Sequence, residues 1–218
     1  MEQEGAAVLK DRRARSDRAA ITDIATGPRP SPGKEYRLVP HPDFPPRAAL
    51  VVKASVSRRS DGCFFLVNFR VHGGLDSIRW PDASAEGRFD RLWEHSCFEV
   101  FLAPGATPSY IEMNFAPGRQ WAAYRFDDYR HGMKDALGIT IHRMDWFVRD
   151  LSVPRAEMQV LLEGPPELET LDWKLGLTTV IEETDGTKSY WALAHAAGPP
   201  DFHNRDCFIA TLPAPEHA

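Results

Sequence analysis

The stretch that decides the fold is residues 92–133, LWEHSCFEVFLAPGATPSYIEMNFAPGRQWAAYRFDDYRHGM. Its runs 96–102 (SCFEVFL) and 109–115 (SYIEMNF) are rich in aromatic and aliphatic residues and flank a loop of Pro, Gly and Ala. Short runs of this kind around Pro and Gly are typical of two paired strands. We therefore expect a β-hairpin here, followed by a third strand at 120–126 (QWAAYRF).

Three polar side chains interrupt this apolar hairpin. Side chains alternate across a strand, so Glu99 lies on one face of its run, and Glu112 and Asn114 share one face of the next. All three can lie on one sheet face, although the sequence does not fix the register. That face is either a solvated outer face or a surface that binds hydroxyl groups, because carboxylates accept hydrogen bonds and an amide both donates and accepts.

Working outward, the same kind of run recurs along most of the chain, separated by loops of Pro, Gly, Asp and Ser. A further hairpin is expected around SRRSDG, which ends in the turn signal Asp-Gly. The pattern predicts an all-β fold, an antiparallel β-sandwich with short helical turns at 89–93 and 168–171. The remaining expected strands are 47–56, 62–71, 139–149, 155–162, 173–183, 189–195 and 207–212.

The first 33 residues differ from the rest. Residues 10–18 are rich in Arg, and 26–33 (TGPRPSPG) form a Pro/Gly breaker cluster. We expect residues 1–33 to be an extension and linker, as a short helix or a disordered tail. Residues 34–213 are then one sandwich domain, since all-β domains of this size are common.

Composition excludes several classes of protein. The formal net charge of -5 and the pI of about 5.9 argue against nucleic-acid binding, which needs a basic surface. No apolar run reaches the roughly 20 residues of a membrane-spanning helix. The first 20 residues lack the apolar core of a secretory signal, so a cytoplasmic location is expected.

Cysteine usage indicates packing rather than chemistry. The three cysteines, Cys63, Cys97 and Cys207, lie in strand-like runs, and an odd number without a secretory signal argues against a disulfide framework. We expect small buried side chains.

In the order of its motifs, the stretch 92–133 resembles the DOMON-like superfamily, which includes family 9 carbohydrate-binding modules. The runs 173–195 and 200–208 (PDFHNRDCF) are similar to DOMON-like bacterial proteins of unassigned function. The resemblance covers roughly residues 36–212. The matching residues are Trp93, Ser96, Glu99, Phe101, Tyr110, Glu112, Asn114, Pro117, Gly118 and Trp121.

The resemblance implies a non-catalytic domain that binds a small sugar-like ligand between aromatic and polar side chains. Trp93 and Glu99 match the sugar-binding positions best, with Glu112 and Asn114 next. A second stacking aromatic is expected from Trp191 or Trp80, with help from Arg125 if its face turns toward the site. Because no enzyme domain is expected beside the sandwich, the sequence is as compatible with a soluble sugar or a protein partner as with a polysaccharide.

Three alternatives remain open. Cytochromes of similar fold hold haem through a Met and a His, and the candidate ligands here are Met113 with His95, His195 or His203. Met113 shares a strand face with apolar residues, which indicates core packing, so no cofactor is expected. A hydrolase would use the two glutamates as acid and base, or a metal at Asp201 and His203. A regulatory or assembly domain, including a homo-oligomer, would use the acidic loop 126–136 or a sheet edge.

Overall fold

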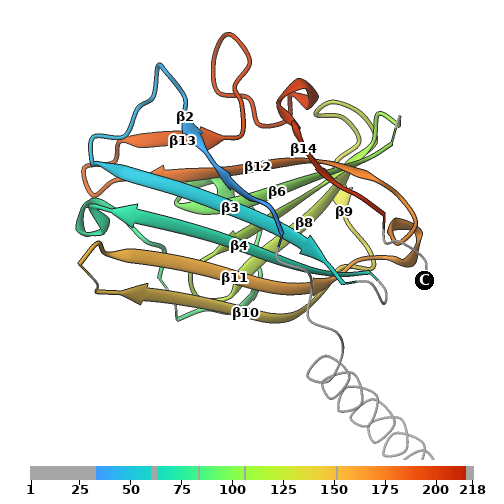
Figure 1. The fold of residues 1–218 in the computed structure, drawn as a ribbon, viewed down its shortest axis with the longest axis horizontal. Helices are drawn as coiled ribbons and strands as arrows, with labels where there is room; N and C mark the ends of the chain where they lie inside the picture. The colour runs from blue at the N-terminus through green and yellow to red at the C-terminus, as the bar shows by residue number, and fades with distance from the viewer. Residues whose placement is uncertain (1–32, 60–62, 83, 106, 151, 215–218) are drawn as a thin grey trace, which may run out of the picture.

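The computed structural model describes residues 33–59, 63–82, 84–105, 107–150 and 152–214, and in these residues the chain is a two-layered β-sandwich. Figure 1 shows the two sheets stacked, with the small sheet nearer the viewer. The predicted extension, residues 1–33, lies outside the described residues except for Gly33. The predicted fold class is confirmed.

The small sheet has five antiparallel strands. In spatial order they are β1 (Glu35–Arg37), β3 (Leu50–Arg58), β4 (Phe64–Gly73), β11 (Arg155–Glu163) and β10 (Thr140–Arg149). The expected hairpin around SRRSDG is the antiparallel pair β3–β4.

The large sheet is antiparallel apart from β5, which runs parallel to β8. Its order is β2 (Val39–Pro40), β13 (Lys188–Ala192), β12 (Trp173–Glu182), β6 (Cys97–Pro104), β7 (Tyr110–Ala116), β8 (Gln120–Phe126) and β5 (Gly87–Arg88), with β14 (Ala210–Leu212) beside β12 and β9 (Lys134–Asp135) beside β8. Single 3-10 turns interrupt the loops: η1 (Leu75–Ser77), η2 (Leu92–Glu94), η3 (Pro166–Leu168) and η4 (Arg205–Cys207).

The main core lies between the two sheets. On β4 every second residue is buried, and Phe69 packs against Phe98 of β6 with ring centroids 5.1 Å apart. Met113, on the same inner face of the large sheet, is 1% exposed, which confirms its expected core role. Burying a side chain of this size contributes about 1.5–3 kcal/mol, so this layer stabilises the fold.

The outer face of the large sheet is also covered. A second apolar cluster forms there around Phe101, Tyr110 and Phe126, and Phe208 from the segment before β14 packs onto it. Consequently β7 is buried along its whole length. The alternative of a solvated outer face at this position is therefore wrong.

The three cysteines are buried free thiols, as expected. Burial raises the pKa of the Cys63 thiol to about 11 and that of Cys97 well above its ordinary value. Within the described segments, no helix is long and apolar enough to cross a membrane.

Candidate functional site

A cavity of about 340 Å³ opens above the outer face of the large sheet. Its volume lies at the lower end of the range for small-molecule sites. Strands supply its floor, and η2, β13 and the loops after β8 and β13 supply its walls. The lining residues are Trp93, Glu99, Glu112, Phe126, Arg130, Met133, Val180, Tyr190, Pro200, Phe202 and His203.

The β6–β7 register brings the two predicted glutamates together on the floor of this cavity. Glu99 pairs across the strands with Asn114, and Phe101 pairs with Glu112. Residues 99, 112 and 114 therefore share the outer face, with Glu99 diagonal to Glu112. The sequence placed them on compatible faces, and the register makes them neighbours.

Glu99 is a buried acid with one unused oxygen. Its side chain receives one hydrogen bond, from the Thr178 hydroxyl on β12 at 3.2 Å. The other oxygen, Oε1, is buried and has no hydrogen-bond partner among the described residues. Burial, together with the charge of Glu112, raises the pKa of the Glu99 carboxyl well above its usual range. An unsatisfied buried carboxyl oxygen in a cavity floor is costly and therefore suggests a ligand.

Glu112 is held by its strand neighbour. The Asn114 amide donates to Glu112 Oε1 at 2.7 Å. Burial raises the pKa of Glu112 to about 6, and the Asn114 hydrogen bond limits that rise. Asn114 itself is fully buried and does not line the cavity. It orients Glu112 and is placed too deep to contact a ligand directly.

His203 closes one side of the floor. The Arg130 backbone amide donates to the Tyr110 hydroxyl oxygen at 3.2 Å, and this hydroxyl lies 2.7 Å from His203 Nδ1. The other ring nitrogen, Nε2, lies 3.7 Å from Glu112 Oε2. Burial lowers the pKa of His203 to about 4, so the ring is neutral at physiological pH.

Asp201 and His203 were the candidate metal ligands, but in the structure their side chains contact other protein groups. Asp201 accepts hydrogen bonds from the Arg130 guanidinium and the Tyr129 hydroxyl, each at 2.8 Å. These contacts join the loop after β8 to the loop before β14. In the part of the chain that is described, no three His, Cys, Asp or Glu side chains are grouped to hold a metal ion.

Aromatic side chains form the walls. Trp93 is half-buried and makes an edge contact with Tyr124 at 5.7 Å between ring centroids. Tyr190 and Phe202 stand on another wall, with ring centroids 6.1 Å apart. The arrangement combines apolar walls with two carboxyl groups at the base, which is a common pattern in small-molecule sites.

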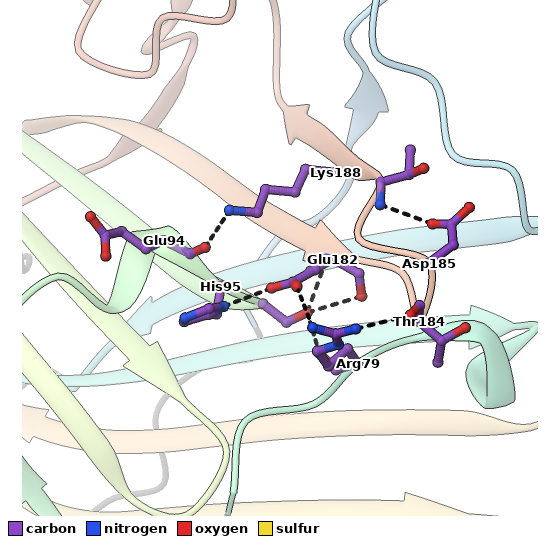
Figure 2. A network of polar contacts seen from close by, with 9 residues as sticks. Arg79, Glu94, His95, Glu182, Thr184, Asp185 and Lys188 are labelled. Atoms are coloured by element: carbon purple, nitrogen blue, oxygen red, sulfur yellow. Dashed lines mark hydrogen bonds and ion pairs between the residues drawn. The ribbon is translucent and has the colours of Figure 1, made fainter.

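A polar network fixes the turn that carries Trp93 (Figure 2). The buried Glu182 carboxylate contacts His95 Nδ1 at 2.7 Å and Arg79 Nη1 at 3.2 Å. The Lys188 ammonium donates to the backbone carbonyl of Glu94. Because these contacts lie immediately after Trp93, they hold η2 against β12 and β13.

Trp80 and Trp191 do not supply the second stacking aromatic. Trp191 is 3% exposed in the main core and donates through Nε1 to the Ser189 hydroxyl at 3.0 Å. Trp80 packs against Trp146 of β10, with ring centroids 4.7 Å apart. Both face the space between the sheets, so this prediction is corrected: the second aromatic wall is Tyr190 and Phe202.

Arg125 also turns away from the cavity. It pairs with Ile111 on β7, and that position alternates with Glu112, so its side chain lies on the other face of the sheet. There it lines a separate cavity of about 720 Å³ with Lys134 and Leu137. That cavity is larger, but the carboxyl groups in its lining, Asp135 and Glu167, are exposed, so the smaller cavity with two buried glutamates is the better candidate.

Sequence reasoning missed three residues of the cavity walls: Tyr190, which lies on β13, and Phe202 and Arg130, which come from loops. Phe202 lies in the motif PDFHNRD and Arg130 in the acidic loop 126–136. Loops carry binding residues on a rigid scaffold, and aromatic residues within such polar loops were the available signal.

No protein-family model and no curated protein matches this sequence. Among solved structures, the chain is similar to a candidate carbohydrate-binding protein from Bacteroides uniformis, with a TM-score of 0.58 and 16% identity over 83% of this chain and 85% of that one. A family 9 carbohydrate-binding module from Caldicellulosiruptor kristjanssonii in complex with cellotriose gives a TM-score of 0.48 and 9% identity over 85% of this chain and 84% of that one. The first likeness shows that the two chains share a fold.

Proposed function

We propose that this chain is a non-catalytic domain that binds one sugar ring in the cavity above Glu99 and Glu112. The observation that carries the proposal is the buried, unpartnered oxygen of Glu99 at the base of an aromatic-walled cavity. A sugar ring has apolar C–H faces that stack on aromatic rings, and hydroxyl groups that both donate and accept hydrogen bonds. The Glu99 and Glu112 carboxyl groups suit such hydroxyls.

Two further points support the proposal. The volume of about 340 Å³ suits a single ring or the terminal ring of a longer chain. The fold is shared with a candidate carbohydrate-binding protein, and the sequence between residues 92 and 133 resembles family 9 carbohydrate-binding modules.

A thermal-shift panel of mono- and disaccharides tests the proposal, with Trp93→Ala as the diagnostic variant. A ligand at 100 times its dissociation constant stabilises the native state by about 2.7 kcal/mol, which raises the melting temperature of a chain this long by about 5–10 °C. Trp93→Ala should remove that rise and still melt cooperatively, because Trp93 is half-buried at the cavity edge.

Trp121→Ala is the matched control. Trp121 is also half-buried but faces the main core, away from the cavity, so this variant should melt earlier and keep its sugar-dependent rise. Equal sugar binding by Trp93→Ala and wild type contradicts the stacking role. No shift with any sugar contradicts the function, and release of nitrophenol from aryl glycosides contradicts its non-catalytic character.

A further inference from the structure

The floor of the cavity holds two buried carboxyl groups on neighbouring strands. Glu99 and Glu112 are 2% and 4% exposed. In the described part of the chain, neither forms an ion pair with a Lys or Arg side chain. Their neighbours on the strands, Asn114 and Thr178, are neutral hydrogen-bond donors.

The charged groups on the surrounding loops act on the two glutamates only from a distance. Arg130 is the one cationic side chain in the described lining, and its charge lowers the pKa of both Glu99 and Glu112. Its ion pair, however, is with Asp201 at 2.8 Å. His203 is buried beside Tyr110 and is neutral above a pKa of about 4. Among the described residues, no Lys or Arg side chain forms an ion pair with either glutamate.

The aromatic walls of the cavity favour a positively charged ligand. The rings of Trp93, Phe126, Tyr190 and Phe202 line the cavity above the carboxyl groups. The face of an aromatic ring carries negative electrostatic potential and attracts a cation placed over it within about 6 Å. Aromatic walls over buried carboxyl groups therefore suit a positively charged group better than a neutral one.

We infer that the ligand carries a protonated amine that is held by Glu99 and Glu112, and, resting on the proposed sugar-binding function, that it is an amino sugar. An ammonium group has three donors and no acceptor, which matches the unpartnered Glu99 Oε1 and the facing Glu112 carboxylate. A uronic acid or a sugar phosphate would instead place its anion against these carboxylates.

The inference also has a proton signature. Burial and the charge of Glu112 raise the pKa of Glu99 well above its usual range, which favours its protonated form before a ligand binds. An ammonium group beside Glu99 favours its charged form, so binding releases a proton, whereas a neutral sugar leaves Glu99 protonated. The nearby groups Cys97 and Tyr110 stay protonated because burial raises both of their pKa values, so they do not contribute to this release.

Isothermal titration calorimetry at pH 7 tests the inference with glucosamine, glucose, N-acetylglucosamine, glucuronate and choline. We expect glucosamine to bind about tenfold or more tightly than glucose, because charge-assisted hydrogen bonds are about twice as strong as neutral ones. Its measured heat should differ between phosphate and Tris buffers in proportion to the proton released. Glucuronate should not bind.

Two variants locate the effect. Glu99→Gln keeps the shape and hydrogen bonds of a protonated carboxyl group but cannot become an anion, so the preference for glucosamine over glucose should fall to near one and the buffer dependence should disappear. Glu112→Gln should lower the same preference. Glu86→Gln, which removes a charge from an exposed surface position, should leave the preference unchanged.

The outcomes separate this inference from the proposed function. Equal binding of glucose and glucosamine overturns the ammonium inference and leaves sugar binding intact. Binding of choline without binding of any sugar keeps the cation site and overturns the sugar-binding function. No binding of any probe overturns both, and retained glucosamine preference in both folded variants overturns the roles of Glu99 and Glu112.

Discussion

The buried Glu112 makes a quantitative prediction for the pH dependence of stability. Burial raises its pKa to about 6 from an ordinary 4.5, a difference of about 2 kcal/mol between its charged and neutral forms. As the pH rises, Glu112 loses its proton near pH 4.5 in the unfolded chain but only near pH 6 in the folded one. The folded state binds more protons in this window, so linkage lowers the free energy of unfolding as the pH rises.

Glu112→Gln removes this titration and keeps the hydrogen bond from Asn114, because the glutamine oxygen can still accept it. The substitution also removes the charge that raises the pKa of Glu99, which adds to the gain in stability. The stabilising effect of a neutral side chain is present at every pH in the variant, whereas wild type loses it above about pH 6. Between pH 4.5 and 7 the variant should therefore gain about 2 kcal/mol relative to wild type, or about 4–8 °C in melting temperature.

Urea unfolding followed by tryptophan fluorescence at pH 4.5, 5.5, 6.5 and 7.5 measures this difference. Glu86→Gln serves as the control, since Glu86 is exposed and its removal should give a difference that does not change with pH. A flat difference between Glu112→Gln and wild type, or one that shrinks as the pH rises, would refute the reasoning that burial dominates the environment of Glu112.

Two further predictions concern the cover over the outer face. A Cβ at Gly176 would lie 2.7 Å from Phe208 Cδ1 and 3.2 Å from Phe101 Cβ. Gly176→Ala should therefore lower the free energy of unfolding, measured in urea, by about 1–3 kcal/mol. An unchanged urea midpoint would mean that Phe208 is free to move aside. Tyr110→Phe removes the hydroxyl between His203 Nδ1 and the Arg130 amide. It should cost about 1–3 kcal/mol and speed hydrogen exchange at Arg130, and an unchanged exchange rate would contradict this placement.

The fold was largely predictable because long strands carry their own signal. Each of the ten strands expected from apolar runs between turn residues overlaps an observed strand, including the pairs β3–β4 and β6–β7. The last, expected at 207–212, begins only at Ala210, because Cys207 belongs to the 3-10 turn η4. Short strands were not expected, since two or three residues show no periodicity. Their strand character comes from the partner, as when β1 adds to β3, so they depend on tertiary structure.

The candidate site was predictable in its floor and not in its walls. Period-two alternation placed Glu99 and Glu112 on compatible faces, and the near-continuous apolar runs around them indicate strands buried on both sides. The walls depend on how loops return across the sheet. Phe202 is 103 positions beyond Glu99. No local sequence pattern indicates whether its loop packs over β6 or extends into solvent. The same lack of information made Trp80 and Trp191 look equivalent to Trp93.

The two buried glutamates oppose stability, and this separates a binding site from a structural pair. Burying a carboxyl group without a counter-ion costs free energy, and apolar residues of similar volume commonly pack as well or better. A structural carboxylate is held by hydrogen bonds within the protein, as Glu183 is when its Oε1 accepts from the Arg47 and Ala48 amides. Glu99 leaves one oxygen unpartnered in the described structure. If the two glutamates bind a ligand, Gln at residue 99 or 112 should raise the free energy of unfolding at neutral pH. The same substitution should weaken the discrimination between ligands. A structural role predicts lower stability and no change in discrimination.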